Sequence, residues 1–429
     1  MEKKIFIALI CLTTMLIYGC NFKNKIAVQD KYSSPIAQGM EELALIYTPS
    51  ATTIHPQVFA RKNEKKNIDL YVIINDSELT FSKTTTNPTA KIRIFYKIME
   101  SYENTALVDS AVKILTFQKS ETPKIYAIKI AVKPVDLEKF VIQSTIRDIN
   151  RGKMSLQFTE IDKKDSLGKD NFLIIKTENN RPSSEDYLKP DESVSVNYLC
   201  SDYQMLYSSF FEADNSIPIL PYNSDPTFKD STVFEITARN FKPTTLITKK
   251  EGLYCFRVDT LSETGLVIPC FNEDYPNIYS LNEMVKPLAY LTSKEEYENI
   301  KNAEHKKLAI DDFWYSCTKD VRKAKELIRV YYTRSIFANM YFYDYREGMM
   351  TDRGMIYIVL GPPKILALTS KTEVWIYKDK HTGEKVRFVF NKEKSPFCAT
   401  KYVLRRSTEF KPYWDNAVAS WRKGNIFSW

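Results

Sequence analysis

The sequence is poor in histidine and glycine. It has only three histidines, His55, His305 and His381, and they are far apart. There is no His-Glu-x-x-His motif and no paired Cys-x-x-Cys motif, so we expect no metal site. The 11 glycines form neither a Gly-x-Ser-x-Gly elbow nor a P-loop, since Gly361-Pro362-Pro363-Lys364 lacks the P-loop spacing. The sequence names no catalytic residue and no cofactor, which favours a non-enzymatic role.

Long runs of one charge are also missing. The formal net charge of +8 is spread along the chain, and the most basic stretch, residues 61–66, contains Glu64. A solvated loop explains such a stretch better than a nucleic-acid site, so we expect no nucleic-acid partner. Asp311 and Asp312 are adjacent carboxylates before an apolar segment, a pattern typical of a loop or a first helical turn.

The amino terminus has the layout of an export signal. Lys3 and Lys4 precede an apolar stretch, Ile5 to Ile17, that is too short to span the roughly 30 Å core of a bilayer. The stretch ends in Ile17-Tyr18-Gly19-Cys20, which resembles the lipobox cut by bacterial lipoprotein signal peptidase, although Tyr18 is bulkier than usual. The resemblance implies that residues 1–19 are removed and that lipid on Cys20 holds the chain to a membrane. An uncleaved anchor or an ordinary secretory signal is the alternative.

The residues after Cys20 suggest in which membrane the protein lies. Asn21 is not the aspartate associated with inner-membrane retention, and Lys23 and Lys25 stand where cell-surface export signals are acidic. We therefore expect an outer-membrane lipoprotein that faces the periplasm. Residues 20–40 are polar and are interpreted as a flexible tether.

The middle of the chain is rich in strand patterns. Apolar residues make up 44% of the sequence, which is enough to build packed cores, and they alternate with polar residues in segments such as Ile68 to Ile74. Helical periodicity is nearly absent before residue 285. We predict an antiparallel, Ig-like β-sandwich over residues 41–178, a polar boundary segment, and a second sandwich over residues 190–283. One large β-domain is the alternative.

The cysteine count leaves room for one disulfide in the second sandwich. Seven cysteines less Cys11 in the signal and the lipidated Cys20 leave five, so at least one is unpaired. The predicted strands 253–259 and 266–272 would place Cys255 opposite Cys270 if Asp259 faced Leu266. Opposed residues have Cα atoms about 4.5 to 5.5 Å apart, within reach of a disulfide. Two buried thiols are the other interpretation.

The character of the sequence changes near residue 284, where we predict an α+β domain that extends to residue 429. Ser293 and Glu296 have the spacing of a capping box that opens a helix. A longer helix is predicted from Lys319 to Tyr343 because apolar residues recur at three and four positions. Strands are predicted at 354–360, 373–378 and 385–391, and a last helix begins at Pro412.

This last region carries a family resemblance. The segments Glu326 to Arg334, Ala338-Asn339, Gly348 to Ile358 and Gly361-Pro362-Pro363 resemble the GWxTD domain, which occurs in exported proteins of Bacteroidota and related bacteria and has no established activity. Met349 stands where the family name has tryptophan. Methionine can fill a core position but would not replace a ligand-binding tryptophan. The candidate interaction or structural residues are Tyr331, Tyr332, Arg334, Asn339, Gly348, Met349, Thr351, Asp352, Arg353, Gly354, Gly361, Pro362 and Pro363.

Two roles are open for this motif. In the structural role, it joins the long helix to the first strand, and Asp352 pairs with Arg334 or Arg353 to fix the angle between them. In the functional role, Asp352, Arg353 and Tyr332 line a surface that recognises a partner or a saccharide.

Two functions are compatible with these observations. The leading hypothesis is a non-catalytic scaffold that docks with another envelope protein, with Phe313-Trp314-Tyr315 or Phe410 to Trp421 at the contact, although Trp314 is explained better as a core residue. The alternative is a glycan-binding or glycan-processing lipoprotein, because 27 tyrosines offer rings that stack on sugars. Hydrolysis would require two facing carboxylates about 5 to 9.5 Å apart.

Overall fold

The computed structural model describes residues 43–429 except 50–51, 53, 64, 84–86, 184–186, 201–205, 213–215, 224–233, 238–243, 260, 263, 379–382 and 396. The predicted export signal, Cys20 and the tether lie outside the described residues. The described residues all belong to one compact unit, Gly39–Trp429. Among the helices of the described part, none combines the length and the apolar character needed to cross a bilayer.

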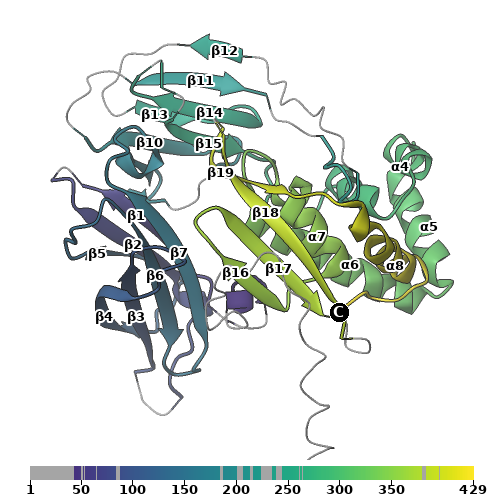
Figure 1. The fold of residues 1–429 in the computed structure, drawn as a ribbon, viewed down its shortest axis with the longest axis horizontal. Coiled ribbons are helices and arrows are strands. Elements are labelled where there is room, and N and C mark those ends of the chain that lie inside the picture. The colour runs from purple at the N-terminus through teal and green to yellow at the C-terminus, as the bar shows by residue number, and fades with distance from the viewer. Residues whose placement is uncertain are drawn as a thin grey trace, which may run out of the picture. The chain divides into compact units, whose positions relative to one another are not determined.

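The first β-region consists of two antiparallel sheets around one core (Figure 1). Strand β3 illustrates why these strands form. Ile92, Ile94 and Ile98 alternate with polar or half-buried residues, so they share one face of the strand, and they are fully buried in the core. The sheet orders are β1-β2-β5 and β4-β3-β6-β7. The strands are β1 (Gln57–Lys62), β2 (Ile68–Asn75), β3 (Thr89–Met99), β4 (Leu107–Gln118), β5 (Ile125–Ala131), β6 (Lys139–Asp148) and β7 (Met154–Asp162).

A second β-region contains two further four-stranded sheets, with orders β13-β10-β8-β9 and β12-β11-β14-β15. Strand β8, which the sequence pattern placed in the first sandwich, pairs instead with β10, so that Phe172 faces Tyr198. This ladder spans the segment that we interpreted as a domain boundary. The strands are β8 (Phe172–Lys176), β9 (Arg181–Pro182), β10 (Ser193–Tyr198), β11 (Tyr207–Phe211), β12 (Phe234–Thr237), β13 (Thr244–Ile247), β14 (Gly252–Arg257) and β15 (Leu266–Cys270).

The predicted disulfide in the second β-region is wrong. Cys255 faces Val267, and Cys270 faces Gly252, so the two cysteines are three rungs apart in the ladder. Both are free thiols, and burial raises the pKa of Cys255 to about 12 and that of Cys270 to about 11. The register differs from the prediction because β14 ends at Arg257 and the connection to β15 is longer than expected.

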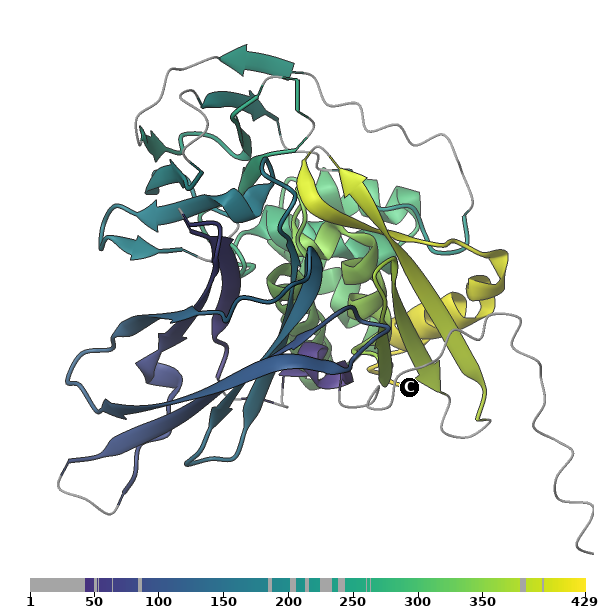
Figure 2. The same ribbon diagram turned by 60° about the vertical axis from the view of Figure 1, so that its left-hand side comes forward.

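The carboxy-terminal region is α+β, as predicted. Figures 1 and 2 show helices α6 and α7 against one face of the antiparallel sheet β16-β17-β18-β19. Its strands are β16 (Ile365–Leu368), β17 (Thr372–Lys378), β18 (Lys385–Ser395) and β19 (Cys398–Leu404). Its helices are α3 (Leu281–Val285), α4 (Lys294–Lys301), α5 (Lys306–Thr318), α6 (Val321–Phe342), α7 (Asp352–Leu360) and α8 (Lys411–Arg422). The 3-10 turns η5 (Lys286–Tyr290), η6 (Gly348–Met350) and η7 (Thr408–Phe410) connect them.

Most of the local predictions in this region are confirmed, but one strand is wrong. The capping box at Ser293 and Glu296 is present at α4, and α6 covers the predicted long helix. Residues 354–360, expected as a strand, form helix α7, and all nine of its residues are buried. A helix that is buried on all sides has no polar face, so its sequence lacks helical periodicity. Its short apolar run is therefore equally compatible with a buried strand.

The aromatic residues proposed as partner contacts lie mainly in the core. Trp314 and Trp421 are fully buried, and the indole of Trp421 donates to the Val359 carbonyl at 3.0 Å. Phe313 and Phe410 are also buried, whereas Tyr315 is 46% exposed. Most of these side chains stabilise the fold and do not offer a docking surface.

Candidate functional site

The Gly348 to Gly354 segment comprises the tight turn η6 and the start of α7. Thr351 caps α7, because its Oγ1 accepts from the Gly354 amide at 3.1 Å and donates to the Gly348 carbonyl at 2.8 Å. A Cβ on Gly348 would lie 2.0 Å from the Ala338 carbonyl oxygen, and one on Gly354 would lie 1.9 Å from the Gly348 carbonyl oxygen. Only glycine fits at either position, so both are required by packing.

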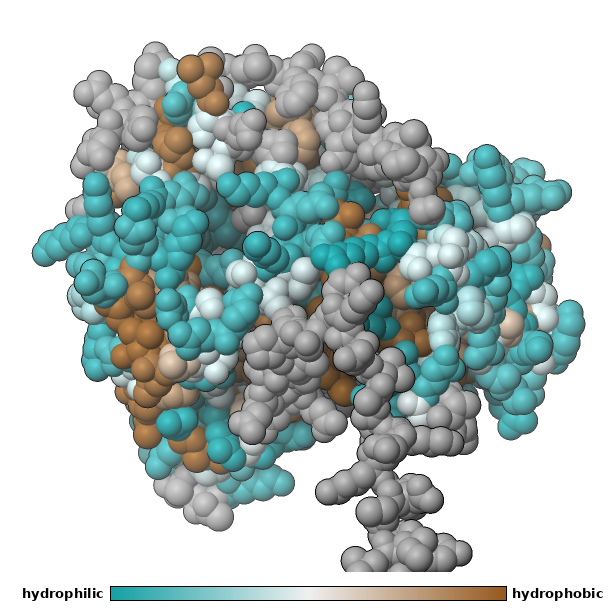
Figure 3. Space-filling view, viewed as in Figure 1, coloured by the Kyte–Doolittle hydropathy of each residue, from teal (hydrophilic) through white to brown (hydrophobic). Residues whose placement is uncertain are grey.

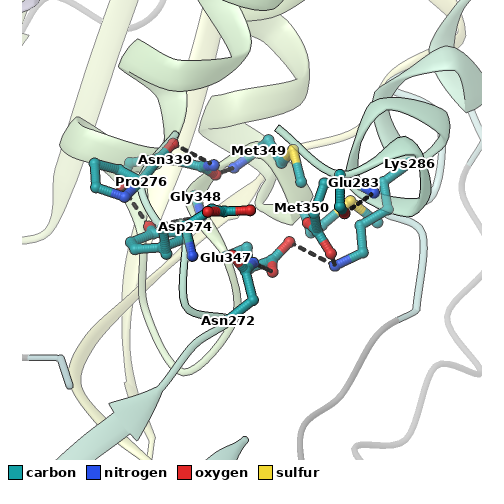
Figure 4. Close-up of polar contacts among 12 residues, drawn as sticks. Asn272, Asp274, Pro276, Glu283, Lys286, Asn339, Glu347, Gly348, Met349 and Met350 are labelled. Atoms are coloured by element: carbon teal, nitrogen blue, oxygen red, sulfur yellow. Dashed lines mark hydrogen bonds and ion pairs between the residues drawn. The ribbon is translucent and has the colours of Figure 1, made fainter. Parts of the chain in front are cut away.

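Met349 fills the centre of this turn. Its side chain is fully buried, its amide donates to Asn339 Oδ1 at 2.8 Å, and its carbonyl accepts from the Tyr290 hydroxyl at 2.7 Å. Asn339 also donates from Nδ2 to the Pro276 carbonyl at 3.1 Å (Figure 4). Methionine therefore occupies this position as a core residue.

Asp352 clamps the start of α7 to the end of β19. Its Oδ1 lies 2.6 Å from Arg406 Nη2, and its Oδ2 accepts from Arg406 Nη1 at 3.2 Å and from the Leu404 amide at 2.8 Å. The expected pairing with Arg334 or Arg353 is wrong. Arg406 also donates to the Ile219 carbonyl at 3.0 Å, so the clamp reaches a third segment of the chain.

Arg353 forms a separate buried pair with Glu373. The Nη1–Oε2 distance is 3.1 Å, and the guanidinium lies 3.6 Å from the centre of the Tyr402 ring. Burial opposes the charge, but the neighbouring Glu373 raises the pKa of Arg353 above its ordinary value. Glu373 Oε1 also accepts from the Trp375 indole at 2.6 Å, so both partners of the ion pair are held in place.

The remaining candidate residues bind the ends of the helices. Arg334 donates to the Ile358 carbonyl at 3.2 Å and to the Phe427 carbonyl at 2.7 Å, and its burial lowers its pKa to about 10. Gly361 ends α7 with a φ of 87° and is followed by Pro362, half-buried, and Pro363, buried. The hydroxyls of Tyr331 and Tyr332 donate to the Pro287 and Met284 carbonyls at 2.6 and 2.9 Å.

The comparison with known families agrees with this architecture. Residues 252–423 match the model of the GWxTD domain. The chain contains a GWxTD domain. The match begins at the first residue of β14, so the domain includes the β14–β15 hairpin that we had assigned to the second sandwich. No curated protein matches the chain.

A charged cluster in the GWxTD domain was missed by the sequence reasoning. Lys286 Nζ lies 2.8 Å from Glu283 Oε1 and 2.9 Å from Glu347 Oε2, and Asn272 Nδ2 donates to Glu347 Oε1 at 3.1 Å (Figure 4). Burial, followed by repulsion from Glu347, raises the pKa of Glu283 to about 7. The Glu-x-x-Lys spacing at 283–286 suggests one ion pair, but nothing in the sequence brings Glu347 to it.

The two carboxylates of this cluster do not form an open hydrolytic pair. Both bind one ammonium group, so the two bonded oxygens are at most 5.7 Å apart, the sum of 2.8 and 2.9 Å. Lys286 fills the space between them, which is where a glycoside would have to enter. Among the described residues, no group of three or more His, Cys, Asp or Glu side chains is placed to bind a metal ion.

A cavity of about 580 Å³ adjoins the cluster. Its lining contains three lysines and two asparagines but no carboxylate, although Glu283 and Glu347 lie behind Lys286. Lys306 Nζ donates to Asn282 Oδ1 at 2.7 Å, and the Lys301 side chain is 54% exposed. The lining residues are Ser216, Ile217, Asn282, Val285, Lys286, Tyr297, Lys301, Asn302 and Lys306.

The candidate residues and the cavity thus have different chemistry. The motif side chains from Tyr331 to Pro363 bind other parts of the chain. The cavity instead offers ammonium and amide donors to a ligand, which suits an anionic or highly polar group.

Proposed function

We propose that this chain is a lipid-anchored envelope protein of the outer membrane, facing the periplasm, whose GWxTD domain is a non-catalytic docking module. The partner is another envelope protein that inserts an acidic group into the lysine-lined cavity. The observation that carries this proposal is the contrast between the inward-facing motif and the cationic lining of the cavity.

The charges of the cavity support an acidic partner. Lys301, Lys306, Asn282 and Asn302 all line the cavity, so an incoming carboxylate would meet several donors, in competition with Glu298, which accepts from Asn302 Nδ2 at 3.2 Å. Lys286 already binds Glu283 and Glu347 and contributes less to binding. Complementary charge of this kind improves specificity and association rate more than it improves affinity.

A pull-down from envelopes tests the docking proposal. The full-length chain is cross-linked in membranes and compared with Lys301→Glu/Lys306→Glu. The matched control is Lys323→Glu/Lys325→Glu, which makes the same charge change on exposed positions of α6. We expect a stoichiometric protein partner that is lost only in the cavity variant.

Two other outcomes of the pull-down would contradict docking through this cavity. If the cavity variant still recovers the partner, the partner binds to another surface of the chain. Recovery of polysaccharide in place of protein would favour the glycan-binding alternative, for which Tyr297 and the two asparagines are suitable contacts.

Lipid anchoring is tested separately. We expect Cys20→Ala to release the chain from the membrane fraction, because the acyl chains on the cysteine are the proposed attachment. Continued sedimentation of the variant with membranes would overturn the anchoring proposal.

A further inference from the structure

Strand β4 is an open edge with an apolar surface. In its sheet, β4 is the outer strand and pairs with β3 alone among the described strands. Val112 is 50% exposed and Ile114 is 59% exposed, and Figure 3 shows a hydrophobic stripe over the region where Figure 1 labels β4 and β5. Exposed apolar edge strands tend to pair with another strand.

On this edge, Val112 and Ile114 turn their backbone groups away from β3, whereas the Ser110 amide donates to Asp109 Oδ1 at 2.6 Å. The Lys119 amide donates to the Pro88 carbonyl at 3.1 Å, which continues the β3–β4 ladder. Since the pattern alternates, the odd-numbered residues of β4 bond to β3, and the backbone groups of Val112 and Ile114 point away from it. The ladder is irregular only opposite Ile98 and Met99, so β4 is regular from Asp109 onward.

The charges on β4 fit a second copy of the same strand in one register. If two copies pair antiparallel with Ala111 facing Ala111, Asp109 of each copy faces Lys113 of the other. Val112 then faces Ser110, and the edge groups of both residues can bond once the Ser110 amide gives up its bond to Asp109 Oδ1. A shift to a pair centred on Lys113 would place two lysines together, which is unfavourable.

We propose that the chain forms a two-fold symmetric dimer through antiparallel pairing of β4 with β4 of a second copy, centred on Ala111. The pairing joins the two four-stranded sheets into one continuous sheet and places side chains of the second copy beside Val112 and Ile114 on the same face. Lys133 now donates to Asp109 Oδ1 at 3.2 Å and to the Ser110 carbonyl at 3.5 Å. Its side chain is 60% exposed and has room to move aside when the dimer forms.

Cross-linking tests the register. Ala111→Cys is introduced into the full-length protein in membranes and compared with Thr116→Cys and with the unsubstituted chain. In the proposed register the two copies of residue 111 have Cα atoms about 4.5 Å apart, which permits a disulfide, whereas residue 116 is far from its own copy. We expect a dimer on a non-reducing gel for Ala111→Cys alone. Monomer for both variants, or cross-linking at residue 116, would overturn the proposal.

A charge exchange tests the predicted pairs. In detergent, sedimentation of full-length Asp109→Lys should show a dimer dissociation constant raised about tenfold, because two attractive pairs become repulsive. Asp109→Lys/Lys113→Asp reverses the pairs and should restore dimerisation. If the dimer dissociation constant of the double variant is as high as that of Asp109→Lys, the proposed register is wrong. Pairing of β4 only with a different protein would also contradict the dimer.

Discussion

The motif charges of the GWxTD domain and the charges on strand β4 of the first β-sandwich differ in their exposure to solvent. In the GWxTD domain, Asp352 and Arg353 are buried, and each is held by a charged partner inside the chain. In the sandwich, Asp109 and Lys113 lie at a strand edge with exposed apolar neighbours. The residues that make the domain recognisable are therefore those that hold it together, and the exposed edge of β4 carries no motif.

The largest effect that we expect comes from the motif glycines. Gly348→Ala should destabilise the protein by at least about 3 kcal/mol or prevent folding, because the added Cβ meets the Ala338 carbonyl at 2.0 Å. Gly152→Ala in the sandwich is the control, since it has a φ of 74° but open space around it and should cost only about 1 kcal/mol. Urea unfolding measures both variants. If both variants lose the same free energy of unfolding, packing at Gly348 is no more restrictive than at Gly152 and the proposed difference between the two regions is wrong.

Breaking the buried Arg353–Glu373 pair should have the next largest effect. We expect Arg353→Ala to lower the free energy of unfolding by roughly 3 to 5 kcal/mol, since it leaves a buried carboxylate without its cation. Arg353→Met/Glu373→Gln removes both charges, keeps an acceptor for Trp375 and should lose less. A double variant that is less stable than Arg353→Ala would show that the ion pair is not the source of the effect.

Glu283 should make the stability of the GWxTD domain depend on pH. Its pKa is raised from an ordinary 4.5 to about 7, so the folded protein holds this proton more tightly than the unfolded chain does. Its contribution to stability is therefore present below about pH 4.5 and is lost as the pH rises through 7. Glu283→Gln should be more stable than the original chain by roughly 1 to 3 kcal/mol at pH 8 and similar to it at pH 4.5.

Thermal unfolding across this pH range checks the Glu283 prediction. Glu121→Gln, an exposed position in the first β-region, is the matched control and should follow the original chain. A loss of stability in Glu283→Gln at both pH values would show that the ionised glutamate stabilises the cluster.

The smallest effect is expected at the two cysteines of the β14–β15 hairpin, at the start of the GWxTD domain. Cys270→Ala should cost only about 1 kcal/mol, because no disulfide is lost. Alkylation of the unfolded, unreduced protein should label both Cys255 and Cys270 by mass spectrometry. If neither cysteine is labelled and the mass of the protein is lower by two hydrogens, Cys255 and Cys270 form a disulfide and the free-thiol assignment is wrong.

Sequence patterns predicted the fold class well where each element has one buried face. The strand alternation in β3 and the Ser293 capping box both describe local geometry, and both appear in the structure. Helix α7 was misread because it is buried on every side. The β14–β15 register was misjudged because the length of a loop does not follow from its residues.

The site was harder to predict than the fold because its contacts are distant in sequence. The motif positions were identified, but the partner of Asp352 is Arg406, and Lys286 joins Glu283 to Glu347. Neither set of contacts produces a recognisable spacing of residues in the sequence. Charged residues of the right sign were available nearer to Asp352, which led to the wrong pairing.

The most direct test of the structural role of the motif is the thermal unfolding of full-length Asp352→Ala, measured together with partner recovery below its unfolding temperature. Loss of the Arg406 clamp and of the Leu404 amide bond should clearly lower the unfolding temperature, while the folded variant still recovers the partner. An unchanged unfolding temperature with loss of the partner would contradict this account and make Asp352 a contact residue.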